Sequence, residues 1–434
     1  MKIGLYLQDY RYNTIKEFES KISVIKEQHL DLLVFPETGY TPDNHIFYCD
    51  NIEADGDREK IINAALELSR KIGCAVILGA NDQFPQFCII YNIYANAYAS
   101  KEETDIQFYY KHTMTEYSPM EFTNYSELID VYFRPIILKN KKLGMTICYD
   151  CNHSAFSRMY YKNNVDIIIN STGGNVVYNK WYRYNKVRAI ENNCFDFCTM
   201  GYSDNNKGNS YVFGFTPNGK LMNNKALFPI YDNLKDMGNI FVYDTDDYFD
   251  DDECECDLSI NQKQTYNEKG EYKIKISDID SLIANAVEID EKLYVKKFGN
   301  NNIVFCFVTE NDITMPEKSL KLLYNSKLKE FSNKKYIIIN RWNKTIDDHF
   351  YKTKLSDILK VRSMENFCAV ILDSPELSMV YQCGYNRTSQ VVEPTAGTYS
   401  LDLNRMGGPE TIWKNKVGMK EVWRNGFERL IERL

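Results

Sequence analysis

Apolar segments alternate with helical patterns along the first 215 residues, and this alternation is the strongest constraint on the fold. The apolar runs include LDLLVF at 30–35, CAVILG at 74–79 and VDIIIN at 165–170. Several of them are apolar nearly throughout, which is typical of strands in a sheet that helices cover on at least one face. The pattern therefore predicts a layered α/β domain.

Charge is distributed unevenly along the 434 residues, a length that suggests two or three domains. Residues 244–257 hold nine acids and no Lys or Arg, and the remaining chain carries 51 acids against 52 bases. We expect residues 244–264 to form an acidic linker. The near-neutral remainder has no basic stripe for phosphates, so a nucleic-acid partner is not expected.

The twelve cysteines are sparse and irregularly spaced, which favours a reducing compartment over a disulfide scaffold. No run of 18 apolar residues is present, and the first residues lack the apolar stretch of a signal peptide. We therefore expect a soluble, cytoplasmic protein with no membrane partner.

The second half of the chain repeats parts of the first. VDIIIN at 165–170 returns as KYIIIN at 335–340, and VRAIENNCF at 187–195 returns as VRSMENFCA at 361–369. Two looser echoes lie in the same order: SYVFGFTPNGK at 210–220 with SQVVEPTAGTY at 389–399, and LGMTICYD at 143–150 with NIVFCFVTEND at 302–312. Four matches in one order predict a partial, degenerate copy of the first domain.

These observations divide the chain into a first domain at 1–243, the linker at 244–264 and a half-domain at 265–434. Apolar residues at helical spacing from Trp423 to Leu434 predict a final amphipathic helix.

Three side chains at strand ends have complementary chemistry. Glu37 follows a buried strand in VFPETGY, Lys111 follows an aromatic strand in FYYKHTMTE, and Cys148 ends the strand GMTICYD. Carboxyl ends of neighbouring strands meet in one crevice, so an acid, a base and a thiol can converge there.

This arrangement resembles the nitrilase, or carbon–nitrogen hydrolase, superfamily over about residues 1–243. The resemblance runs through Phe35-Pro36-Glu37, Tyr91-Asn92, Lys111-His112, Cys148-Tyr149-Asp150, Arg158, Trp181, residues 188–192, Gly208, Ser210, Pro217 and Gly219. It implies that residues 1–243 form a catalytic four-layer αββα sandwich with a Glu–Lys–Cys triad, followed here by a non-catalytic partial copy. Family members usually pair two sandwiches through their helical faces, and a partial sandwich leaves apolar faces uncovered. We therefore expect the half-domain to cover part of the first domain's helical face as an internal pseudo-partner, with a homo-oligomer as a further possibility. In that copy the position of Cys148 falls at about Val308, and no counterpart of Glu37 or Lys111 precedes it. Asn92, Arg188 and Glu191 are expected to hold the scaffold.

The resemblance also implies the role of each site residue. Glu37 would take the thiol proton and later activate water, and Lys111 and the Tyr149 N–H would stabilise the oxyanion. Glu116 resembles the second glutamate that many members use to position substrate and lysine. Tyr149, Thr172 and His153 are expected at the substrate.

The chain departs from the family after Cys-Tyr-Asp. His153, Ser154 and Ala155 stand where the family commonly has Phe, Pro and Glu, so the substrate and the dimer contact are expected to be unusual. Cys148 and Cys151 also have the spacing of a redox or zinc pair, but no second pair completes a zinc site. We expect no metal and no cofactor.

The predicted reaction is hydrolysis of a non-peptide C–N bond in a small amide or N-carbamoyl compound, through a thioester. An acyl or amidino transferase with the same triad is the alternative. A binding or scaffold protein that has lost turnover is the alternative from another class.

Overall fold

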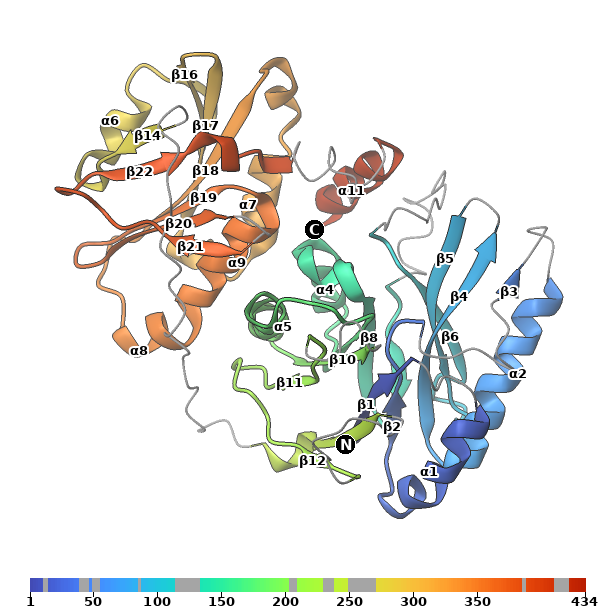
Figure 1. Cartoon of the computed structure of the whole chain (residues 1–434). Helices are drawn as coiled ribbons and strands as arrows, with labels where there is room; N and C mark the ends of the chain where they lie inside the picture. The colour runs from blue at the N-terminus through green and yellow to red at the C-terminus, as the bar shows by residue number, and fades with distance from the viewer. Residues whose placement is uncertain are drawn as a thin grey trace. The chain divides into compact units, whose positions relative to one another are not determined.

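The computed structural model describes residues 1–10, 15–38, 47–48, 55–84, 87–113, 133–202, 209–228, 238–248, 271–384, 388–409 and 421–434. They fall into two compact units, within Met1–Glu253 and within Cys254–Leu434. Figure 1 labels the helices and strands of both units. In the described ranges no helix is long and apolar enough to cross a membrane.

The first unit contains two sheets. The strands of the first sheet are β6 (Ile106–Tyr110), β5 (Phe87–Ala95), β4 (Ala75–Phe84), β2 (Leu32–Val34), β1 (Lys2–Asp9), β13 (Asn239–Asp244) and β12 (Lys225–Ala226), with β3 (Phe47–Tyr48) beside β4. The strands of the second sheet are β7 (Ile136–Leu138), β8 (Lys141–Ile147), β9 (Ile167–Thr172), β10 (Phe195–Tyr202) and β11 (Phe213–Phe215). The sheets join where the carboxyl ends of β1 and β10 pair in parallel, Gln8 with Gly201 and Asp9 with Tyr202.

Helices cover the outer face of each sheet. On the first sheet, α1 (Ile15–Glu27) and α2 (Asp55–Ile72) bury apolar side chains such as Phe18 and Leu68 against β4 and β5. On the second sheet, α4 (Ser154–Lys162) and α5 (Tyr178–Asn192) lie on the opposite side of the unit (Figure 1). The Tyr160 ring of α4 lies against Gly144 of β8, where a Cβ would be 2.7 Å from the ring. A larger residue at position 144 would push α4 off the sheet.

The inner faces of the two sheets contact each other. The Asn92 amide of β5 donates to the Ser171 hydroxyl of β9 at 3.2 Å, and Ser171 donates to the Phe35 carbonyl at 3.0 Å. The order of layers is therefore helix, sheet, sheet, helix, which confirms the sandwich predicted for this part of the chain.

The second unit has one large sheet of mixed direction. Its strands are, in sheet order, β15 (Val287–Asp290), β16 (Leu293–Phe298), β17 (Asn301–Thr309), β18 (Lys334–Arg341), β19 (Ala369–Asp373), β20 (Ser378–Cys383) and β21 (Ser389–Val391). Its longer helices are α7 (Pro316–Leu323), α9 (Ser356–Asn366) and α11 (Glu421–Arg433), the last at the position expected for a terminal amphipathic helix.

A two-stranded ribbon of β14 (Glu271–Ile274) and β22 (Tyr399–Asp402) covers one face of this sheet. With the short helix α6 (Ile279–Ile283), it packs on alternate residues of β17, β18 and β19, including Ile337 and Ile339. In the first unit, the corresponding face of the second sheet lies against the first sheet. The ribbon therefore stands where a sandwich would have its other sheet.

The pairing pattern β16–β17–β18–β19–β20 repeats that of β7–β8–β9–β10–β11, with helices α7 and α9 in the places of α4 and α5. One echo in the sequence does not follow this pattern. β20 pairs with β19 as β11 pairs with β10, so the echo of residues 210–220 at 389–399 falls one strand further out. A partial copy of the first domain stays a prediction, and the shared order of pairing is what such a copy requires.

The structure describes one of the proposed boundaries, that between the first domain and the acidic linker. Within the acidic stretch, β13 ends at Asp244 and a short 3₁₀ turn covers Thr245–Asp247, so its first residues continue the first unit. The rest of the predicted linker, from residue 249 to 264, lies outside the described residues.

Candidate active site

Glu37 lies in a tight turn that follows β2 and crosses β4. A Cβ on Gly79 of β4 would be 2.0 Å from the Pro36 carbonyl oxygen and 2.9 Å from the Glu37 Cα, so only glycine allows this crossing. The next residue, Thr38, has φ of 51°, which is strained for a β-branched side chain. The surrounding structure therefore fixes the direction of the Glu37 side chain.

Lys111 lies immediately beyond β6, where its N–H donates to the Ile90 carbonyl at 2.9 Å. Its ammonium contacts the Glu37 Oε1 at 2.7 Å, and both side chains are buried. Burial disfavours the charged lysine, but the negative charges of Cys148 and Glu37 outweigh this and raise the pKa of Lys111 above its ordinary value. A fixed positive charge therefore lies beside the thiol.

Cys148 is the first residue after β8 and begins a 3₁₀ turn that spans Cys148–Asn152. Its φ is 48°, in the left-handed region that non-glycine residues rarely adopt. Strain of this kind is concentrated at functional positions. Burial, reinforced by the Glu37 carboxylate and opposed by Lys111, raises the pKa of the thiol to about 12. The resting thiol is therefore protonated, and it needs a base such as the adjacent Glu37 to react.

The end of β9 completes this cluster. The Gly173 N–H donates to the Glu37 Oε2 at 3.0 Å, so both oxygens of the carboxylate have donors. Thr172 is buried, and its hydroxyl accepts from the Cys198 thiol at 3.9 Å. The Gly173 amide, one residue after the predicted substrate residue Thr172, therefore lies beside the Glu37 carboxylate.

Two of the other predicted residues are neighbours on the nucleophile's turn. Tyr149 is half-buried, and its ring meets the His153 ring edge-on at 5.9 Å. Burial, with Arg188 and Lys180 nearby, lowers the pKa of His153 to about 3, so its imidazole is neutral. The Lys180 ammonium lies 5.5 Å from the centre of the Tyr149 ring. Glu116 lies outside the described residues.

Asp150 has a role that the sequence analysis did not assign. Its buried carboxylate accepts hydrogen bonds from both sides of Lys111 and from the end of β8. The donors are the Tyr109 hydroxyl at 3.0 Å, the His112 N–H at 3.2 Å, the Thr113 N–H and hydroxyl at 2.8 Å each, and the Ile147 N–H at 3.2 Å. Asp150 thereby ties the Lys111 segment to the strand of Cys148. Burial raises its pKa to about 6 against the opposing effect of Lys111.

A signal for Asp150 was present in the sequence, because it is a charged residue two positions from the candidate nucleophile at the end of an apolar strand. Its partners, however, come from residues about 40 positions earlier, and local patterns do not show them.

Arg188 and Glu191 form a buried ion pair within α5, as expected for scaffold residues. The Arg188 Nε also donates to the Cys151 carbonyl at 2.8 Å. This bond attaches the 3₁₀ turn of Cys148 to α5.

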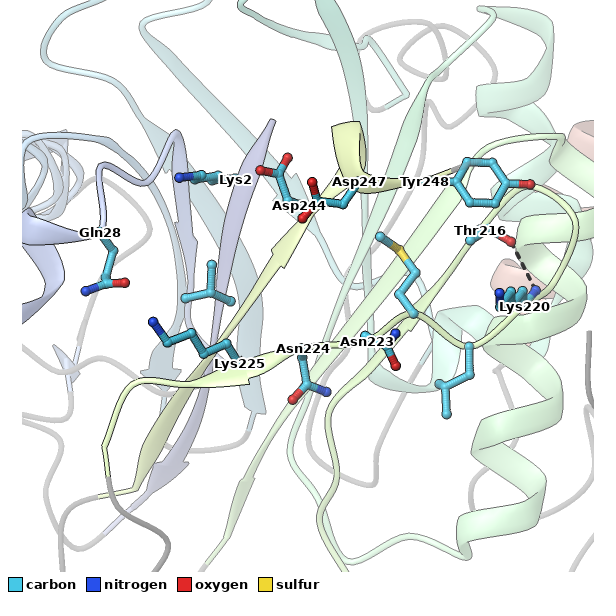
Figure 2. A pocket seen from close by; sticks show the side chains of 13 residues that line it. Lys2, Gln28, Thr216, Lys220, Asn223, Asn224, Lys225, Asp244, Asp247 and Tyr248 are labelled. Atoms are coloured by element: carbon cyan, nitrogen blue, oxygen red, sulfur yellow. Dashed lines mark hydrogen bonds between the residues drawn. The ribbon is translucent and has the colours of Figure 1, made fainter. Parts of the chain in front are cut away.

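A separate cavity of about 420 Å³ lies around β12 and β13 (Figure 2). Lys2, Lys220, Lys225, Asn224 and Asp247 are among its lining residues, and Glu37, Lys111 and Cys148 are not. In the described part of the chain, no three His, Cys, Asp or Glu side chains come together as metal ligands would.

The comparison with known protein families agrees with the positions of the candidate catalytic residues. The carbon–nitrogen hydrolase family matches residues 11–215, a range that contains all three candidate catalytic residues. No curated protein matches the sequence.

Similar solved structures include an amidase from Nesterenkonia sp. AN1, with 15% identity and a TM-score of 0.40, covering 56% of this chain and 92% of that one. A carbon–nitrogen hydrolase from Helicobacter pylori G27 has 16% identity and a TM-score of 0.41, covering 56% and 89%. Nit3 of Saccharomyces cerevisiae, a member of branch 10 of the nitrilase superfamily, has 16% identity and a TM-score of 0.40 with the same coverage. The family match assigns residues 11–215, within the first unit, to the carbon–nitrogen hydrolases, and the protein is an enzyme of that class.

Proposed function

We propose that the protein hydrolyses a C–N bond in a small amide or N-carbamoyl compound through a thioester on Cys148. The observation that carries the proposal is the meeting of the Glu37 carboxylate, the Lys111 ammonium and the Cys148 thiol at one set of strand ends. A carboxylate, a fixed cation and a thiol are the three groups that this chemistry requires.

In the first half of the reaction, Glu37 takes the proton of Cys148 as the sulfur attacks the carbonyl carbon. The negative charge that develops on the carbonyl oxygen faces Lys111 and the Tyr149 N–H. Loss of one such donor typically costs about 2.7–4 kcal/mol of transition-state stabilisation. The C–N bond then breaks, and the leaving nitrogen takes the proton from Glu37.

In the second half, Glu37 removes a proton from water, which attacks the thioester. The C–S bond breaks, the acid is released, and the thiol regains its proton. An amine in place of water would give a new amide instead, which is the transferase alternative.

The test is intact mass after incubation with small amides, N-carbamoyl amino acids, nitriles and glutamine. Wild type is compared with Glu37→Gln, which should lose turnover because Glu37 is needed both to form the thioester and to hydrolyse it. We expect an adduct on Cys148 whose mass gives the acyl group, and ammonia or an amine from wild type. Added hydroxylamine or amine that diverts the acyl group faster than water would favour the transferase. The absence of any adduct and any release, with Cys148 alkylating no faster than Cys254, would overturn the proposal in favour of a scaffold protein.

Two further proposals concern the setting of the enzyme. No disulfide joins the eight cysteines in the described ranges, which supports the cytoplasm as its compartment. The second unit is proposed to act as an internal pseudo-partner for the first. A chain shortened to residues 1–248 that keeps its full stability and activity would contradict that role.

A further inference from the structure

Tyr10 is the first residue after β1, at the point where the two sheets of the first unit join. Its N–H donates to the Tyr202 carbonyl at 2.8 Å, which continues the pairing of β1 with β10. Its hydroxyl donates to the main-chain carbonyl of Glu37 at 2.6 Å. The hydroxyl also interacts with the Thr38 side chain. Tyr10 therefore contacts the turn of the candidate base at two consecutive residues.

The ring of Tyr10 is held in place by two glycines. A Cβ on Gly201 of β10 would lie 2.0 Å from the ring Cζ and 2.4 Å from the hydroxyl oxygen. A Cβ on Gly173 would lie 3.9 Å from the same hydroxyl and 3.2 Å from the Glu37 Oε2. The ring thus rests on the main chain at Gly201, and its hydroxyl reaches the side of Glu37 that faces Gly173.

The turn that Tyr10 contacts needs support from outside. Thr38 has a positive φ, and such a conformation persists only where the surroundings stabilise it. Gly79 leaves room for the turn, and Ser171 donates to the Phe35 carbonyl before it. Tyr10 supplies the hydrogen bond at Glu37 itself, from the end of the neighbouring parallel strand β1.

We propose that Tyr10 is a positioning residue for Glu37, which it holds at Cys148 through the bond from its hydroxyl to the Glu37 carbonyl. This inference rests on the proposed function, in which Glu37 is the general base. A shift of about 1 Å in a catalytic group can cost up to roughly 100-fold in rate. Burial, with the charges of Glu37 and Cys148, keeps the pKa of Tyr10 well above its ordinary value, so the hydroxyl remains a donor at neutral pH.

The first test is Tyr10→Phe, which removes the hydroxyl and keeps the ring. We expect kcat to fall roughly 10- to 100-fold with KM and the melting temperature nearly unchanged. The rate of Cys148 alkylation by iodoacetamide at pH 7 should fall as well, because it depends on the same base. The matched control is Tyr98→Phe, since the Tyr98 hydroxyl also donates to a main-chain carbonyl, that of Arg70 at 3.1 Å, on the surface. That control should leave both rates as in wild type.

The second test is a double-mutant cycle between Tyr10 and Gly201. Gly201→Ala puts a methyl group into the ring of Tyr10 and should lower kcat as Tyr10→Phe does. In a Tyr10→Ala background the same methyl group meets no ring, so Gly201→Ala should have little further effect on kcat. Such non-additivity is the sign of two residues that act through one contact.

The inference would be overturned if Tyr10→Phe kept the kcat and the alkylation rate of wild type. Additive effects in the double-mutant cycle would also overturn it, as would a loss of kcat that only matches the loss of folded protein. Alkylation needs no substrate, so it separates this inference from the proposed function. If wild type turns over no amide, the proposed function fails. If wild type is active and Tyr10→Phe is equally active, only the role of Tyr10 fails.

Discussion

Helices α5 and α9 belong to different units but share their internal bonding. In α5, Arg188 pairs with Glu191 and the Asn192 amide donates to the Arg188 carbonyl; in α9, Arg362 pairs with Glu365 at 2.7 Å and Asn366 donates to the Arg362 carbonyl. Both helices end on a left-handed residue, Asn193 and Phe367, although Phe is poorly suited to that conformation. The shared VR-x-x-EN segment therefore encodes a helix and its termination in both units.

The strand ends beside these helices differ. Asn170 of β9 pairs with Thr146 of β8, and Asn340 of β18 pairs with Val308 of β17. If the two asparagines are matched, Cys148 corresponds to Glu310 and not to Val308, the position expected from the sequence. The two assignments differ because the sequence alone does not show the register between neighbouring strands. Glu310 pairs with Lys344 at 3.1 Å, and no strained turn residue stands at its position.

The helix and its buried ion pair are present in both units and therefore belong to the scaffold, whereas the matched strand ends differ, with Cys148 in the first unit and Glu310 in the second. Substitutions at matched positions in the two units test whether scaffold and chemistry are separate. Their expected effects range from a loss of turnover to almost none.

Cys148→Ala should lower turnover roughly 10³-fold or more, because it removes the nucleophile. Glu310→Ala, at the matched position of the second unit, should change turnover by no more than about twofold, as expected for a substitution away from the reaction. Steady-state kinetics on a substrate found by the mass screen measures both. Comparable losses in the two variants would show that the second unit takes part in the chemistry.

Arg188→Ala and Arg362→Ala each leave a buried glutamate without its partner. Each should cost about 3–5 kcal/mol of stability, measured by denaturant unfolding. Arg188→Ala should also lower kcat in protein that is still folded, because Arg188 holds the Cys151 carbonyl of the nucleophile's turn. An equal loss of kcat per folded molecule in Arg362→Ala would contradict the separation of the two helices.

Asp150 and Asp312 occupy matched positions and have opposite pKa shifts. Burial raises the pKa of Asp150 to about 6, so its contribution to stability is present below about pH 4 and is lost as the pH rises through 6. Despite partial burial, the Thr309 hydroxyl and Lys292 lower the pKa of Asp312, so its contribution is present above about pH 4 and is lost as the pH falls.

The unfolding free energies of Asp150→Asn and Asp312→Asn are measured from pH 3 to 7, and each is subtracted from that of wild type. The two differences should change with pH in opposite directions. The slope for Asp150 lies between about pH 4 and 6. Slopes of the same sign would mean that the burial of Asp150 does not control its titration.

Cys151→Ser should have the smallest effect, with turnover within about twofold of wild type in reducing buffer, because the Cys151 thiol takes no part in the proposed reaction. Residues three apart in a 3₁₀ turn eclipse one another, so diamide should oxidise Cys148 and Cys151 to a disulfide and be reduced to its hydrazine. Wild type should lose activity and regain it with dithiothreitol, and Cys151→Ser should lose less. Equal loss in both would exclude this pairing.

The sequence was sufficient for the parts of the molecule that local patterns determine. Apolar runs predicted the strands, and the motifs around Glu37, Lys111 and Cys148 predicted three groups that the structure brings together. Contacts between distant segments were not predictable. Tyr10 meets Glu37 because β1 and β2 are parallel neighbours, and Asp150 finds its distant donors because β6 lies near the end of β8. The ribbon of β14 and β22 joins segments more than 100 residues apart, and neither segment indicates its partner.

The reaction centre draws Glu37 and Lys111 from the first sheet and Cys148 and Gly173 from the second. During synthesis the base and the cation emerge from the ribosome well before the thiol does. Until the two sheets dock, Cys148 has neither its base nor its cation, and it is an ordinary cysteine among twelve. Under the proposed function, Cys148 gains its base only when the two sheets dock, so a nascent or misfolded chain lacks the arrangement that the reaction needs.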